Sequence, residues 1–138
     1  MNRQWWWGVL IIAIAGAGMW LRLGNLDRRP MHVDEAVNTI IFQDLIDQGR
    51  YEYDPIDRHG PALHYLALVF YYAGGAGSFA QTSEFTFRLV PVVCGVGVIL
   101  LCWSLRSAMG AVAMTASAVL CAVSPAMVFY SRYYIHEM

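Results

Sequence analysis

Long apolar runs are the feature that most limits what this chain can fold into. Residues 5–22, 88–105 and 111–130 each come close to the roughly 20 apolar residues that a helix needs to cross a bilayer. Only 14% of all residues are charged, whereas a soluble domain usually has about 25%. The sequence therefore predicts an all-α integral membrane protein with about three transmembrane helices.

The first run, within residues 5–22, has one alternative interpretation. A cleaved signal peptide would fit the small residues Ala15 to Ala17, which resemble a cleavage site. The apolar run continues beyond them to residue 21, however, and Arg3 is the one charged residue before it. We therefore favour a membrane span whose tryptophan cluster lies at the interface.

A shorter apolar run covers residues 61–77. Pro61 suits the first turn of a helix, and the glycines near residue 75 suit its end. The strongly apolar part, residues 62–73, is short for a span and contains His64. This run is either a fourth span or a helix lying at the membrane surface.

Composition excludes several other classes of protein. The formal net charge is −1, so no basic surface for nucleic acid is predicted. The 3 cysteines lie in apolar stretches without a CxxC pair, which argues against a disulfide framework and a zinc site. We interpret them as small buried hydrophobic residues.

The connection over residues 23–87 is far longer than an ordinary loop. A helix is predicted within it over residues 36–49. Val37, Ile41 and Leu45 form one apolar stripe along this helix, but other apolar residues fall outside the stripe. That pattern indicates contacts on several sides of the helix.

Two adjacent carboxylates, Asp34 and Glu35, lie where this helix is expected to begin. Asp34 could cap the helix, with Glu35 favoured by the helix dipole. A carboxylate held rigidly at a helix start is equally suited to act as a catalytic base. Ionisable groups near membranes are often functional, and the two interpretations are compatible.

The order of four segments along the chain indicates a family resemblance: LRLGNLDRRPMHVDEA, RHGPALHYLALVF, FRLVPVVCGVGVILL and SPAMVFYSRYYIHEM. By order and spacing, residues 21–138 resemble the N-terminal region of the GT-C membrane glycosyltransferases. The nearest groups are the protein O-mannosyltransferases, the aminoarabinose transferases of lipid A and a related flippase-associated family of N-glycosylation loci. The resemblance implies that residues 1–138 are the N-terminal portion of a longer GT-C transmembrane domain.

The resemblance also implies a topology and an activity. The loop over residues 23–87 would be extracytoplasmic and the helix over 61–77 interfacial, although the arginines of this loop disagree with the positive-inside rule. The implied reaction is sugar transfer from a polyprenyl-phosphate donor to a protein or lipid-glycan acceptor at the outer face of the cell membrane. Three helices cannot enclose both substrates, so we expect residues 1–138 alone to be inactive.

In the resembled family an acidic pair follows the first span, and a second acidic residue follows the third. Asp34, Glu35 and Glu137 match these positions and are the predicted catalytic residues. Asp34 is our choice for the general base, because an acceptor hydroxyl must lose its proton as it attacks the sugar. The other two carboxylates are assigned to the same site by position.

The leaving polyprenyl phosphate needs a counter-charge. Arg132 is the first candidate, Arg58 the second, and His59 either contacts the phosphate or stabilises its own turn. A divalent metal is the alternative, held by Asp34 and Glu137, although Glu137 could instead pair with Arg132. No cofactor is otherwise predicted.

Two other functions fit parts of the pattern. A transporter fragment would use the acidic residues as intramembrane proton or cation sites, but these residues lie at the ends of the runs. A non-catalytic partner in lipid-linked glycan assembly would have the same fold without transfer activity.

Overall fold

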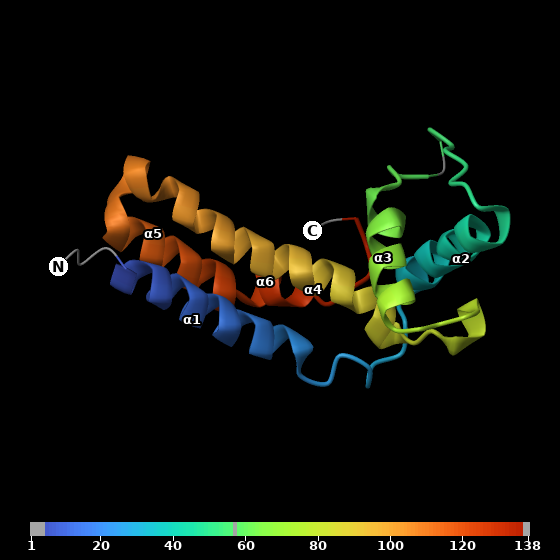
Figure 1. Cartoon of the computed structure of the whole chain (residues 1–138), viewed down its shortest axis with the longest axis horizontal. Coiled ribbons are helices and arrows are strands. Elements are labelled where there is room, and N and C mark those ends of the chain that lie inside the picture. Colours follow the sequence, from blue (N-terminus) through green and yellow to red (C-terminus); the bar gives the residue numbers. More distant parts are fainter. Residues whose placement is uncertain (1–4, 57, 137–138) are drawn as a thin grey trace.

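The computed structural model describes residues 5–56 and 58–136, and every regular element among them is a helix. Helices α1 (Trp5–Leu23), α4 (Glu84–Leu101) and α5 (Arg106–Val123) pack together as an elongated bundle (Figure 1). Helices α2 (Val33–Gln48) and α3 (Ala62–Ala73) lie at one end of this bundle. Three shorter helical segments complete the chain: η1 (Phe79–Gln81), η2 (Cys102–Leu105) and α6 (Pro125–Tyr130).

Within the described residues, two helical stretches are long and apolar enough to cross a membrane, Trp5–Leu23 and Glu84–Val123. The second has 40 residues, and a straight helix of that length would be about twice as long as the hydrocarbon core is thick. Figure 1 shows that it folds back on itself into α4 and α5. Gly110, with φ at 81°, interrupts the helical backbone between the predicted spans over residues 88–105 and 111–130.

The last predicted run, residues 111–130, forms two helices rather than one. Helix α5 ends at Val123, and α6 begins at Pro125. Between them Ser124 has a φ of −56° and a ψ of 124°, which is not helical. Proline disfavours helical backbone at the residue before it and has no N–H to donate, so the helix breaks at this point.

A buried arginine of α1 spans the break between α5 and α6. Arg22 donates hydrogen bonds to the carbonyl oxygens of Cys121 at 3.0 Å and Ala122 at 3.1 Å. Its Nε donates to Ser131 Oγ at 2.7 Å. A Cβ on Gly95 would lie 2.6 Å from Ser131 Cβ, so the glycine leaves room for this contact. Arg22 therefore ties α1 to the chain on both sides of the break.

The start of α2 corrects one expectation. His32 is the N-cap, and its Nδ1 accepts a hydrogen bond from the Asp34 backbone N–H at 3.3 Å. The Glu35 carboxylate reaches back to accept a hydrogen bond from the His32 N–H at 3.0 Å. The interpretation of Asp34 as the helix cap is therefore wrong. Gly49 ends the helix with φ at 72°, as the sequence indicated.

The buried face of α2 is not the apolar stripe seen in the sequence. Val37, a member of that stripe, is 52% exposed. The buried residues of α2 are Glu35, Asn38, Thr39, Phe42 and Leu45. Three of these five are polar, and their partners lie elsewhere in the chain or on the helix itself.

Helix α3 runs across the direction of the bundle (Figure 1). It has 12 residues and is therefore about 18 Å long, against roughly 30 Å for a hydrocarbon core. Residues at its core-facing side include Leu63, Ala67 and Tyr71, while Leu66 and Val69 are exposed. The helix starts and ends slightly inside the predicted range of residues 61–77.

The C-terminal segment, residues 131–136, returns to α2. Tyr134 is fully buried and packs in one apolar cluster with Phe42 and Phe87. Asn38 of α2 donates a side-chain hydrogen bond to the Tyr134 carbonyl oxygen at 3.1 Å. This segment and the start of α2 therefore lie together, at the end of the bundle that carries the long connection.

Candidate functional site

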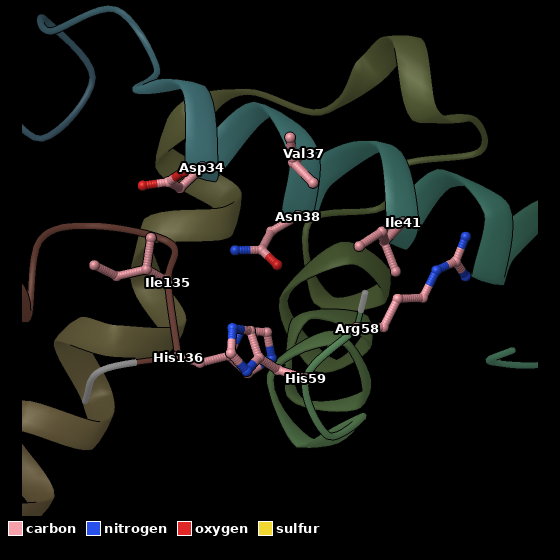
Figure 2. Close-up of a pocket in the computed structure, with 8 residues that line it drawn as sticks. All are labelled: Asp34, Val37, Asn38, Ile41, Arg58, His59, Ile135 and His136. Atoms are coloured by element: carbon pink, nitrogen blue, oxygen red, sulfur yellow. The ribbon is translucent and has the colours of Figure 1, made fainter. Parts of the chain in front are cut away.

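A pocket of about 320 Å³ lies between α2, the segment of residues 58–59 and the C-terminal segment (Figure 2). Asp34 is near one end of it and Arg58 near the other, while two imidazole rings lie across from α2. The lining residues are Asp34, Val37, Asn38, Ile41, Arg58, His59, Ile135 and His136. Three predicted site residues, from two separate segments, thus share one cavity.

Asp34 presents an accessible carboxylate. Its side chain is 67% exposed, and Oδ2 lies 3.2 Å from Nδ1 of His32. The same nitrogen accepts the Asp34 backbone N–H as the helix cap. The Asp34 oxygens remain able to accept a proton from a bound hydroxyl.

Asp34 also borders a second cavity, of about 180 Å³, on its other side. Phe129, Tyr130 and Tyr133 form the aromatic wall of this cavity. The Arg29 guanidinium lies 3.7 Å from the centroid of the Tyr133 ring, a cation–π contact that holds this wall. The Asp34 carboxylate is therefore reached from a polar pocket and from an aromatic one.

Glu35, one residue later, has the opposite environment. It is fully buried, and its Oε1 accepts hydrogen bonds from Arg88 Nε at 2.8 Å and the Tyr134 N–H at 2.9 Å. Its Oε2 accepts from Arg88 Nη2 at 2.8 Å and from the His32 N–H. Burial alone would raise the pKa of Glu35, but these hydrogen bonds outweigh it and hold the pKa below its usual value. The Glu35 carboxylate is therefore ionised and fully occupied by protein donors.

Arg88, at the start of α4, completes this buried arrangement. Beyond its two-pronged contact with Glu35, it donates to the carbonyl oxygens of Leu26 at 2.7 Å, Arg29 at 2.9 Å and Pro30 at 3.2 Å. These carbonyls belong to the loop that leads into α2. Arg88 and Glu35 together fix the path of the chain just before Asp34.

The two predicted phosphate-binding arginines lie in different places. Arg58 lines the pocket, where Asp44 Oδ2 lies 3.6 Å from its guanidinium and the Glu52 carbonyl oxygen accepts a hydrogen bond at 3.1 Å. Arg132 does not line the pocket; its guanidinium donates to the Gly24 carbonyl oxygen at 2.6 Å. Arg58 is therefore the arginine that the fold brings to the same cavity as Asp34.

Three histidines gather at the pocket. The ring centroids of His59 and His136 are 4.8 Å apart, and those of His64 and His136 are 5.5 Å apart. His64 is buried next to His136, and its Nδ1 lies 3.3 Å from the hydroxyl of Tyr134. Burial, with repulsion from His136 and Arg58, lowers the pKa of His64 to about 4. His64 is thus neutral near pH 7 and supports the ring of His136.

Of the two predicted metal ligands, Asp34 and Glu137, only Asp34 lies within the described residues. Glu137 lies outside the described residues, so its predicted roles in catalysis and metal binding stay predictions. Among residues 5–56 and 58–136, no group of three or more His, Cys, Asp or Glu side chains is placed to hold a metal ion.

Sequence reasoning overlooked several residues that build the site. His136 and Asn38 carried no local signal, because their place in the pocket depends on the return of the C-terminal segment to α2. Arg88 did carry a signal, since a charged residue inside an apolar helix usually has a buried partner. Its partner, Glu35, was assigned to catalysis instead.

The chain was also compared with known proteins. No protein-family model matches it, and no curated protein or solved structure does either. Any function assigned to the chain therefore rests on its own residues and their arrangement.

Proposed function

We propose that this chain forms the N-terminal part of a membrane glycosyltransferase of the GT-C kind, with Asp34 as its general base. The observation that carries the proposal is the position of Asp34. Its exposed carboxylate lies at the rigid start of α2, on a pocket that is also lined by Arg58, His59 and His136, side chains that suit a phosphate. Transfer of a sugar from a lipid phosphate needs both a base and phosphate-binding groups in one site.

The proposed topology has three spans, formed by α1, by α4 and by α5 with α6. Helix α3 is too short to be a fourth and lies across the bundle, which suits a helix resting on the membrane surface. The pocket then lies at the membrane interface on one side, where a lipid-linked donor presents its headgroup. By the resemblance, this is the extracytoplasmic side of the cell membrane.

In the proposed reaction Asp34 accepts a proton and the other pocket residues stabilise the leaving group. The acceptor hydroxyl approaches Asp34, gives up its proton to the carboxylate and forms a bond to the anomeric carbon of the sugar. The bond from that carbon to the phosphate oxygen breaks, and the polyprenyl phosphate leaves with the electron pair. Arg58 and the imidazoles of His59 and His136 stabilise the leaving phosphate, unless a divalent metal does so. Glu35 acts by holding α2 and the loop before it.

The transporter alternative is less well supported. Intramembrane proton sites need titratable groups that change partners inside the bundle, whereas Arg22 and Arg88 are fully engaged by carbonyls, Ser131 or Glu35. Asp34 lies outside the bundle altogether. A non-catalytic partner of the same fold remains the second candidate, and the experiment below separates it from an enzyme.

The test compares Asp34→Asn and Asp34→Ala in the full-length protein, assayed in membranes for sugar transfer from a polyprenyl-phosphate donor. We expect transfer to fall by roughly 10²- to 10⁴-fold in both variants, the usual contribution of a general base. Thermal stability should stay near that of the wild type, because His32 and not Asp34 caps α2. Asp47→Asn, an exposed acidic position of the same helix, is the matched control and should retain activity.

Two outcomes of this test discriminate between the functions, and a chelation experiment separates a metal from the side chains. Full transfer by Asp34→Asn would remove Asp34 from the catalytic role. Absence of transfer in a stable wild-type protein, with every donor tried, would favour the non-catalytic partner. Transfer that persists after divalent cations are chelated would assign charge neutralisation to Arg58 and the imidazoles.

A further inference from the structure

We propose that the turn between α4 and α5 binds the headgroup of an anionic phospholipid, at the end of the bundle opposite the candidate site. This inference rests on the proposed topology and not on the sugar-transfer reaction. The turn contains an open cavity of about 470 Å³, which shares no lining residue with the two cavities beside Asp34. Its lining residues, from η2 and the start of α5, are Trp103, Ser104, Arg106 and Ser107.

Arg106 brings a positive charge with available donors to this cavity. Its guanidinium carbon lies 5.0 Å from the centroid of the Trp103 ring, a cation–π contact that orients the side chain. Among residues 5–56 and 58–136, the Arg106 guanidinium has no hydrogen-bond acceptor and no carboxylate partner. The buried guanidinium of Arg22, by contrast, is occupied by carbonyls and Ser131. Arg106 can therefore donate two hydrogen bonds to the oxygens of one phosphate.

This end of the bundle has no negative charge to oppose Arg106. The sequence has no Asp or Glu before Asp27, and none between Glu84 and Glu137. Figure 1 shows the turn of α4 into α5 beside the start of α1, whereas the long connection lies at the other end of the bundle. A headgroup with a net negative charge therefore fits better than a zwitterionic one, whose ammonium group would find no carboxylate here.

The other side chains around the cavity suit a phospholipid better than a free anion. Ser104 Oγ donates a hydrogen bond to the Leu101 carbonyl oxygen at 2.7 Å, and its lone pairs can still accept one from a headgroup hydroxyl. The Ser107 hydroxyl can donate to a phosphate oxygen. Leu105 and Met109, on either side of these residues in the chain, are exposed apolar side chains. They offer a surface on which acyl chains can pack.

Three tryptophans place the cavity at the depth of lipid headgroups. A Cβ on Gly8 would lie 3.8 Å from Trp103 Cη2, so the Trp103 ring packs against the first turns of α1. Trp5 and Trp6, at the start of α1, stack with ring centroids 3.8 Å apart, and both are exposed. Tryptophan is enriched where lipid tails meet headgroups. In the proposed topology this interface is the cytoplasmic one, whose leaflet carries the anionic lipids.

The test measures the lipid bound to the purified full-length protein. Protein in detergent would be mixed with equal amounts of phosphatidylglycerol and phosphatidylcholine, and native mass spectrometry would count each lipid retained. We expect the wild type to retain phosphatidylglycerol preferentially. Arg106→Gln should lower this preference by about fivefold, the usual contribution of one arginine near an anionic lipid surface, whereas Arg106→Lys should keep much of it. Arg28→Gln removes an exposed charge beyond the other end of α1 and is the matched control.

Each outcome supports or overturns the proposal. An unchanged lipid preference in Arg106→Gln would overturn it, and so would an equal loss in Arg28→Gln, which would reflect overall charge and not this cavity. Displacement of phosphatidylglycerol by excess inorganic phosphate would show a site for free anions. If Trp103 and Arg106 serve only as interfacial anchors, the wild type should retain both lipids equally. Because the readout is bound lipid, failure here leaves the role of Asp34 untouched, and absence of sugar transfer leaves this prediction standing.

Discussion

Replacing Arg88 with methionine is the sharpest test of how this fold is held together. The change keeps much of the side-chain volume but removes both hydrogen bonds to Glu35 and those to the carbonyl oxygens of Leu26, Arg29 and Pro30. Glu35 then remains buried as a carboxylate without its cation. Removing one partner of a buried ion pair typically costs about 3–5 kcal/mol. Since small domains have total stabilities of about 5–15 kcal/mol, this loss would be severe.

The predicted loss of stability comes from leaving the Glu35 carboxylate buried without a cation, and not from the strength of the ion pair itself. In the double variant Glu35→Gln/Arg88→Met no buried charge is left, so a large part of the stability should return. Arg88→Lys keeps the charge but lacks the planar fork that reaches both carboxylate oxygens, and it should give an intermediate loss. Arg50→Met removes an exposed ion pair with Glu52 and should cost less than about 1 kcal/mol.

The assay is unfolding of the purified protein in lipid nanodiscs, combined with hydrogen exchange over residues 24–35. We expect Arg88→Met to lower the free energy of unfolding by several kcal/mol and to increase exchange in this loop. The reasoning fails if Arg88→Met and Arg50→Met have the same stability within about 0.5 kcal/mol. It also fails if the double variant is less stable than Arg88→Met alone.

Three further outcomes follow from the bundle and the histidines. Gly95→Ala should destabilise the protein by about 1–3 kcal/mol in thermal unfolding, because its Cβ would lie 2.6 Å from Ser131 Cβ. Gly97→Ala on the same helix is the control: its Cβ would meet nothing within 4 Å, so the change should be neutral or stabilising. Arg22→Met should loosen the junction of α5 and α6 and speed hydrogen exchange over residues 121–131, since it removes the donors to their carbonyls. Stability should fall as pH is lowered from about 6.5 to about 4, because His64 takes up a proton more readily when unfolded than in its buried site, where its pKa is about 4. His64→Gln should remove this loss in a pH series of unfolding curves, while the acid loss caused by Glu35, whose pKa is also lowered, should remain at lower pH.

Local signals predicted the helices well where a helix is set by its own residues. Gly49 ends α2, and the short apolar stretch of residues 62–73 is helix α3, as composition and turn residues indicated. The sequence predicted one span over residues 111–130, whereas the structure breaks it at Ser124. The structure tolerates this break because Arg22, about 100 residues away in the chain, donates hydrogen bonds to the carbonyl oxygens of Cys121 and Ala122. The sequence near the break gives no sign of so distant a partner.

The buried face of α2 could not be predicted for the same reason. Periodicity arguments place polar residues toward solvent, yet Glu35 and Asn38 point inward. Their partners are Arg88 and the backbone of Tyr134, which lie 53 to 99 residues away in the chain. The candidate site shows the same limit, because Asp34 could be singled out from its position whereas His136 becomes part of the pocket only through the tertiary fold.

The adjacent carboxylates Asp34 and Glu35 have different roles because of helix geometry. Successive residues of an α-helix point about 100° apart, so the neighbour of a side chain that faces the core can point toward solvent. The hydrogen bonds that bury Glu35 against Arg88 and His32 also fix the rotation of α2, and this rotation directs Asp34 toward the pockets. Substitution of Glu35 should therefore lower stability and activity together, whereas substitution of Asp34 should lower activity alone. Equal losses of stability from both substitutions would show that the pair serves only to hold the start of α2.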